Sequence, residues 1–172
     1  MIEQGKKIRS RDRSVSRGEK RAAARLAAVQ ALYQMELAGK GLNEVLAEFE
    51  SFWMGREIEG DQYKPAEAAL FRLILEGVLA DQVALDQAVD RILEGWPLKR
   101  VEAIMRATLR AGAFELKHGK DVPPRVILSE YVDIASAFLE KDEVGMVNAV
   151  LDRLARDYRA EDLAKPAPPR ES

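Results

Sequence analysis

KRAAARLAAVQALYQMEL, residues 20–37, contains neither glycine nor proline and repeats its apolar side chains at the period of an α-helix. The repeat places one apolar stripe along the segment: Ala22, Leu26, Val29, Tyr33 and Leu37. Ser16 and Glu19 stand at the capping-box spacing before it, and Gly39 and Gly41 follow it. We therefore expect an amphipathic helix that begins near Arg17 and ends before Gly39.

The helical period continues along the chain, and the alternation typical of strands is absent. Further apolar stripes predict helices over about 42–53, 65–78, 81–96, 101–118, 125–138 and 144–158. A polar loop is expected over 55–63. From Ala160 onward the period is lost and three prolines appear, so we expect 160–172 to be a disordered Pro-rich tail. The predicted fold class is all-α, a bundle of about seven helices.

Positive charge is concentrated at the N-terminus. The first 25 residues hold nine basic and three acidic residues, a balance of +6, whereas the whole chain carries −2 and residues 26–172 therefore carry −8. Such segregation typically serves binding to a polyanion, and the predominant arginines suit phosphate contacts and base stacking in RNA. We predict a basic flexible arm over 1–17 and a helical RNA-binding domain over 18–159. A merely solubilising tail is the alternative.

Arginines recur every four residues at the start of the first helix, at Arg17, Arg21 and Arg25, with Lys20 beside them. At 100° per residue they form one slowly drifting stripe, which we place about 120° from the apolar stripe. This spacing predicts a rigid basic ridge that flanks the core and binds RNA. The alternative, pairing with acidic neighbours along the helix, has only Glu19 nearby.

Several classes of protein are disfavoured by what the chain lacks. It contains no cysteine and a single histidine, His118, which we expect only to complement a helix dipole. It contains no glycine-rich phosphate loop, dinucleotide fingerprint or metal-binding histidine pair. Neither a membrane span nor a signal peptide is apparent. We expect a cytoplasmic protein with no catalytic residues, no metal and no cofactor.

Six segments carry a family resemblance in their order and spacing. They are KRAAARLAAVQALYQMEL (20–37), LFRLILEGV (70–78), RAGAFEL (110–116), DVP (121–123), SEYVDIASAF (129–138) and VNAVLDR (147–153). Together with Leu85-Asp86 and Trp96 they resemble the NusB family of bacterial transcription antitermination factors over about 18–158. The resemblance implies two packed helical halves, in agreement with the helix count obtained from periodicity.

By the same resemblance the protein binds single-stranded boxA-type RNA of nascent ribosomal RNA transcripts, as a heterodimer with the ribosomal protein NusE. Other Nus factors and RNA polymerase are then indirect partners. Lys20, Arg21 and Arg25 match the basic start of the family's first helix, and Asp142 and Met146 match its RNA face. Tyr33 and Arg110 match its surface for the protein partner.

The chain departs from the family pattern at several of these positions. Ala22 and Ala23 replace two arginines, Ala149 replaces a glycine, and Met146 replaces an aromatic residue that would stack on a base. We also expect Asp142 to cap the seventh helix while repelling RNA phosphates.

The two positions matched to the protein partner have further interpretations. Tyr33 lies on the predicted apolar stripe, so it is equally a candidate core residue. Arg110 interrupts an apolar helix and needs either an acidic partner or an interface.

Two further functions stay open at this point. One is a helical adaptor that binds only protein. The other is a stand-alone RNA-binding domain related to the front module of RNA cytosine methyltransferases. A methyltransferase itself is not expected, because the chain has no segment for a Rossmann-type cofactor site.

Overall fold

A computed structural model describes residues 17–58 and 65–165, with side chains over 18–51 and 67–165. The predicted arm before Arg17, the capping serine and most of the Pro-rich tail lie outside the described residues. The helices are α2 (Arg17–Ala38), α3 (Leu42–Ile58), α4 (Pro65–Leu93), the 3-10 turn η1 (Leu98–Arg100), α5 (Ala103–His118), α6 (Pro124–Phe138), α7 (Lys141–Tyr158) and α8 (Ala160–Ala164).

The described ranges contain seven α-helices and no strand, so the all-α prediction is confirmed, although three boundaries differ. The helices expected over 65–78 and 81–96 are one helix, α4, because no proline or turn sequence separates them. The turn α8 occupies part of the expected tail, since Arg159 binds Asp162 through its guanidinium at 2.5 Å. The helix α3 also runs to Ile58, into the segment expected to be a loop.

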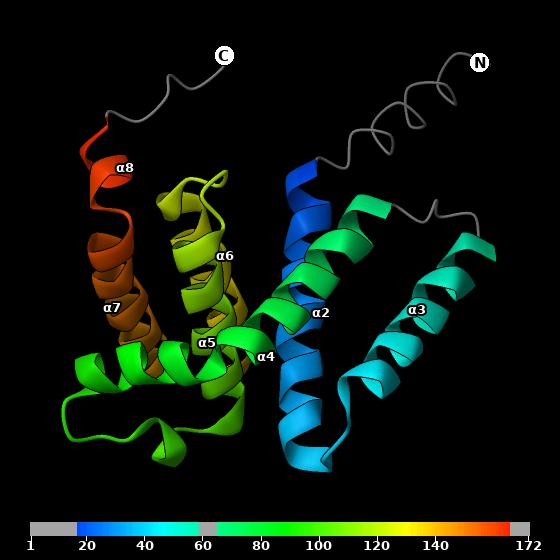
Figure 1. The fold of residues 1–172 in the computed structure, drawn as a ribbon, viewed down its shortest axis with the longest axis horizontal. Helices are drawn as coiled ribbons and strands as arrows, with labels where there is room; N and C mark the ends of the chain where they lie inside the picture. The colour runs from blue at the N-terminus through cyan, green and yellow to red at the C-terminus, as the bar shows by residue number, and fades with distance from the viewer. Residues whose placement is uncertain (1–16, 59–64, 166–172) are drawn as a thin grey trace, which may run out of the picture.

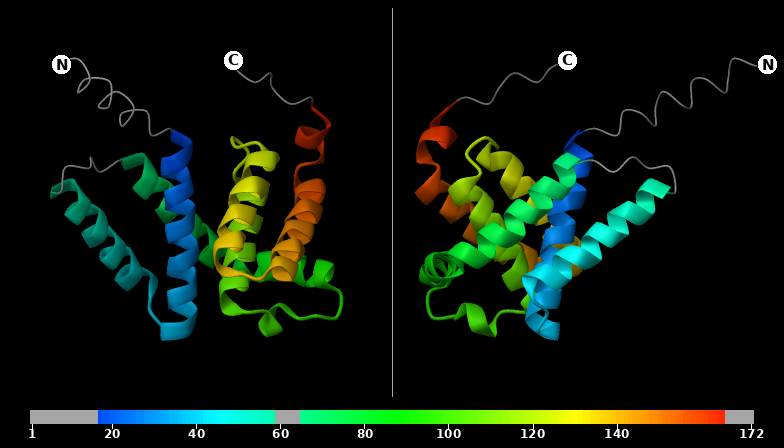
Figure 2. Two further views of the ribbon diagram at one scale, coloured as in Figure 1. Left: turned by 180° about the vertical axis from the view of Figure 1, so that it is seen from behind. Right: turned by 45° about the vertical axis from the view of Figure 1, so that its right-hand side comes forward.

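The helices form two groups that share α4. Figure 1 shows α2 and α3 as a hairpin on one side and α5, α6 and α7 on the other, with α4 passing between the groups. The turned views in Figure 2 show the same division. The groups are joined by α2, which packs against both α4 and α5. The expected arrangement of two packed helical halves is therefore confirmed.

Two glycines allow α5 to sit at the centre of the bundle. A Cβ added to Gly77 of α4 would lie 2.1 Å from the ring of Phe114, and one added to Gly112 of α5 would lie 2.9 Å from Leu151. Side chains larger than hydrogen would therefore separate α5 from α4 and from α7. This close packing buries most of α5 and makes it the element against which α2 and α6 are positioned.

Candidate nucleic-acid interface

The start of α2 presents the basic side chains expected from the sequence. Arg21 is exposed and forms no ion pair with any described residue, and Lys20 is partly exposed beside it. Arg17 is the first residue of α2, but its side chain lies outside the described ones. An exposed guanidinium without a carboxylate partner is free to bind phosphate. Arg21 is thus available for the predicted contacts with RNA, and Lys20 lies partly exposed beside it.

Arg25 does not belong to this exposed group, contrary to the expectation from the sequence. It is only 2% exposed and forms a two-point ion pair with Glu115 of α5, at 2.7 Å from Nε and 3.0 Å from Nη2. Burial lowers the pKa of Arg25, but the hydrogen bond and charge of Glu115 raise it more, so the guanidinium stays charged. The basic ridge ends inside the protein, and we assign Arg25 a structural role.

The hydroxyl of Tyr131 in α6 completes this buried cluster by donating a 2.5 Å hydrogen bond to Glu115. Burial and the charge of Glu115 raise the pKa of Tyr131 well above its usual value, which keeps the hydroxyl protonated as a donor. Three helices, α2, α5 and α6, therefore meet at one carboxylate. The cluster fixes the position of the basic start of α2 relative to α6.

The sequence contains a signal for the burial of Arg25. Ala28, Val29 and Leu32 are buried and lie three, four and seven residues after it, the positions that share its side of a helix. The buried face of α2 is wider than the predicted apolar stripe, because buried alanine residues belong to it as well, and Arg25 lies on this wider face. A charged residue surrounded by such positions requires a buried partner.

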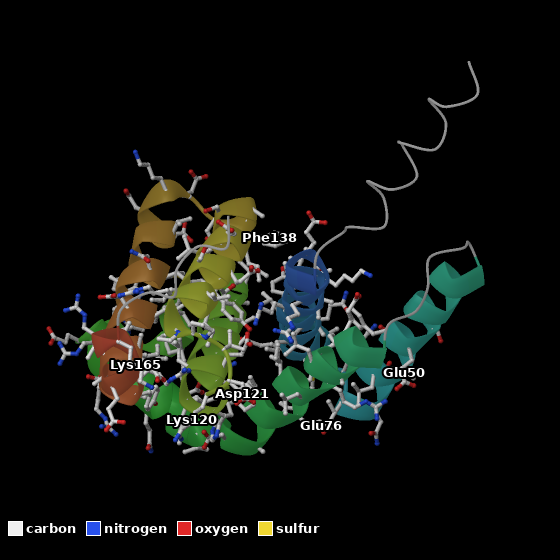
Figure 3. All side chains as sticks on the ribbon, turned by 90° about the horizontal axis from the view of Figure 1, so that it is seen from above. Glu50, Glu76, Lys120, Asp121, Phe138 and Lys165 are labelled. Carbon is white, nitrogen blue, oxygen red and sulfur yellow. The ribbon has the colours of Figure 1, made fainter. Side chains whose placement is uncertain are left out.

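An open groove of about 460 Å³ separates the first half of α2 from the second half of α6. Its lining is mostly small or aliphatic and also includes carboxylates: Gly18, Glu19, Ala22, Ala23, Leu26, Glu130, Asp133, Ile134 and Ala137. Burial raises the pKa of Glu130, while the charge of Arg25 opposes the shift. Ala22 and Ala23 form part of the groove wall. Figure 3 shows the end of α6, with Phe138, beside α2.

Asp142 and Met146 lie on one face of α7, one turn apart. Asp142 is exposed in the first turn, and Met146 is 39% exposed. The expectation that Asp142 caps the helix is wrong, because the N-cap residue is Glu140 and no side chain caps this end. Asp142 is the second helical residue, so its charge can only favour the positive end of the helix dipole. This leaves its carboxylate accessible to a ligand.

The side chains matched to the protein partner gather at the other end of α2. Tyr33 is half-buried, so its ring packs on the core while part of it reaches solvent. Arg110 is held by Asp86 of α4 through two hydrogen bonds of 2.8 Å, which supplies the acidic partner that its position in α5 requires. Glu36 of α2 lies 3.5 Å from Arg110 and also binds Arg106.

This charged network holds the surface around Tyr33 in one arrangement. Arg106 donates further hydrogen bonds to the carbonyl oxygens of Leu98 and Val101, at 2.9 and 2.7 Å, and so ties the connection before α5 to α2. Arg106 was not singled out from the sequence, because its partners are far apart in the chain.

Within the described ranges no helix is long and apolar enough to cross a membrane, and no cluster of metal-binding side chains occurs.

The family model described as the NusB family matches residues 22–156. The chain belongs to the NusB family. It is 63% identical to the transcription antitermination protein NusB of Bradyrhizobium sp. (strain BTAi1 / ATCC BAA-1182) over 91% of each chain. It is also 63% identical to the protein of the same name from Nitrobacter hamburgensis, over 87% of this chain and 94% of the relative. By this membership the protein is a transcription antitermination factor and not an enzyme.

Solved structures share the fold. NusB of T. maritima is 28% identical, with a TM-score of 0.72 over 84% of this chain and 97% of that one. A structure of the antitermination factors NusB and NusE in complex with dsRNA gives a TM-score of 0.69 at 21% identity, over 81% of this chain and 98% of that one. The bundle described above is therefore the NusB fold.

Proposed function

We propose that the protein binds boxA-type single-stranded RNA of nascent ribosomal RNA transcripts together with the ribosomal protein NusE. In this way it acts on RNA polymerase with other Nus factors to oppose termination. Family membership supports the proposal, as does the fold shared with the NusB of a complex that contains NusE and RNA. Because transcription by this polymerase takes place in the bacterial cytoplasm, the proposal also assigns the protein to that compartment.

The exposed basic start of α2 is the observation that carries the RNA-binding part. Lys20 and Arg21 lie on a helix that the buried Arg25–Glu115 ion pair holds in place, so their positions are set before RNA arrives. Preorganised cations lose less conformational entropy when they bind phosphates. Asp142 and Met146 extend the proposed RNA face onto α7. Tyr33 and Arg110 form the proposed surface for NusE.

A titration of labelled RNA with the full chain, followed by fluorescence anisotropy, tests the proposal. The RNAs are a boxA-type strand and a scrambled strand of the same composition, each with and without NusE. We expect tighter binding of the boxA strand, and a further gain with NusE. Equal affinity for both RNAs under both conditions would contradict the proposal and favour an adaptor that binds only protein.

A further inference from the structure

The groove between α2 and α6 has the chemistry of a nucleobase site rather than of a phosphate site. Its walls are provided by alanine, leucine and isoleucine side chains, and no basic residue is among the described residues that line it. Its polar groups are the carboxylates of Glu19, Glu130 and Asp133. Carboxylates repel phosphate but accept hydrogen bonds from the exocyclic amino groups of bases. The groove therefore suits an apolar ring that carries an amino group.

Asp133 is the carboxylate best placed to act in this way. It is exposed, and no side chain or backbone group in the described ranges forms a hydrogen bond or an ion pair with its carboxylate. Glu130 is closer to the buried cluster and feels the charge of Arg25, and Glu19 already has an interaction within the protein. The carboxylate of Asp133 can thus accept a hydrogen bond from a ligand in the groove.

Phe138 is an aromatic residue at the end of α6, next to the groove in sequence but not among the residues that line it. It is 45% exposed, which is unusual for a phenylalanine, and it follows directly on Ala137 of the groove. Figure 3 shows this end of α6 beside α2, whereas Asp121 lies at the opposite end of the helix. Single-stranded RNA is recognised by splaying bases out and stacking them on such rings. An exposed ring here offers the stacking that Met146 cannot supply.

The groove is also continuous with the basic start of α2. Lys20 and Arg21 lie within the same helical segment that supplies the residues from Gly18 to Leu26 on one wall. Basic groups on the α2 side can therefore hold the backbone of a strand while one of its bases enters the groove. Phosphate contacts position a nucleic acid, whereas contacts to bases specify its sequence.

We propose that the α2–α6 groove is a subsite for one unstacked RNA base that carries an exocyclic amino group, with Asp133 as the hydrogen-bond acceptor and Phe138 as the stacking surface. The inference rests on the proposed function, because it assumes that single-stranded RNA is the ligand. It assigns base recognition to two residues outside the basic ridge. The strand then depends on Lys20 and Arg21 for affinity and on the groove for sequence.

An abasic scan of the RNA tests the stacking surface. Each nucleotide of a boxA-type strand is replaced in turn by an abasic ribose, and binding to the full chain is measured for the wild type and for Phe138→Ala. With the unmodified strand we expect Phe138→Ala to weaken binding by about 5- to 150-fold, the usual range for one stacked base. At one position of the RNA, removal of the base should weaken binding to the wild type but should hardly change binding to Phe138→Ala.

Matched variants separate this effect from general damage. Phe138→Leu keeps an apolar side chain without the ring and should weaken binding like Phe138→Ala. Trp96→Ala removes an aromatic side chain that is 54% exposed and belongs to neither α2 nor α6, and it should leave affinity unchanged. Thermal melts should show both Phe138 variants folded, because the residue ends its helix and is half exposed.

Asp133→Ala tests the hydrogen bond. In the wild type, replacing the base at the position found by the scan with an analogue that lacks the amino group should weaken binding, and in Asp133→Ala it should not. Asp121→Ala, at the far end of α6, should behave like the wild type. If Asp133→Ala instead tightens all RNAs equally, the carboxylate only repels phosphate and the inference is overturned.

The same measurements distinguish failure of the base subsite from failure of the proposed function. If boxA RNA is still preferred over scrambled RNA but the abasic profiles of the wild type and Phe138→Ala coincide, the base subsite is wrong and the proposed function stands. If the wild type has no preference for boxA RNA, the proposed function fails and the subsite fails with it.

Discussion

Arg25→Ala should unfold the protein at a markedly lower temperature, although the residue belongs to the arginine series at the start of α2. Arg25 is 2% exposed and Glu115 is 3% exposed, so truncation leaves a buried carboxylate that has, among the described residues, only the hydroxyl of Tyr131 as a partner. Breaking a buried ion pair from one side costs about 3–5 kcal/mol. That is a large share of the stability of about 5–15 kcal/mol that is typical of a folded protein.

The corresponding change in melting temperature can be measured by circular dichroism at 222 nm. For a chain of this size, 1 kcal/mol lowers the melting temperature by about 2–4 °C, so we expect a decrease of about 6–20 °C. Arg21→Ala is the matched control, since it removes the same side chain from an exposed position one turn earlier. It should change stability by less than about 0.5 kcal/mol.

A double variant tests the cause of the loss. Arg25→Met with Glu115→Gln removes both charges and keeps an amide oxygen that can accept from Tyr131, so it should be more stable than Arg25→Ala. If Arg25→Ala melts within about 2 °C of the wild type while RNA binding is lost, Arg25 faces the ligand and the buried ion pair is wrong.

Four further predictions concern the remaining charged groups. Deleting residues 1–17 should weaken binding of all RNAs and reduce the log–log salt slope by about 0.7 for each lost phosphate contact, whereas an unchanged slope would show a passive tail. Asp142→Asn and Asp142→Ala should both tighten RNA binding, because each removes a charge that repels phosphate. Both should cost similar, small amounts of stability in thermal melts, because no side chain caps α7. Weaker binding would mean that the carboxylate accepts a hydrogen bond from RNA. Arg110→Ala should weaken binding of NusE in calorimetric titrations without changing affinity for RNA alone, and equal binding of NusE would exclude Arg110 from that surface. The hydrogen bonds from His118 and Lys117 lower the pKa of Asp81. The contribution of Asp81 to stability is therefore present above the usual carboxyl pKa of about 4 and is lost as the pH falls through the lowered value. Asp81→Asn should flatten the acid side of a curve of melting temperature against pH.

The fold class could be predicted from the sequence because each helix is specified by the residues within its own segment. The period of apolar residues and the positions of glycine and proline gave the all-α class and most helix boundaries. The break expected between 78 and 81 was an interruption of the apolar pattern and not of the backbone, so α4 is continuous. The turn at Ala160–Ala164 depends on the side chain of Arg159 reaching Asp162 and the carbonyl oxygen of Val122, which a periodicity argument does not detect.

The candidate site was only partly predictable because burial depends on tertiary contacts. Lys20 and Arg21 are accessible as expected, and Arg110 has the acidic partner that its position demands. Arg25 and Glu115 are 90 residues apart, so their ion pair could not be read from spacing along one helix. The groove likewise arises where α2 and α6 pack, and neither helix shows it alone.

The antitermination activity can be measured by transcription in vitro. Purified bacterial RNA polymerase transcribes a template with a boxA-type element upstream of a terminator, in the presence of NusE and the other Nus factors, with or without the protein. We predict that the protein increases read-through of the terminator, and that a template with a scrambled boxA element or the variant Arg21→Ala gives a smaller increase. Equal read-through with and without the protein on the boxA template would contradict the account.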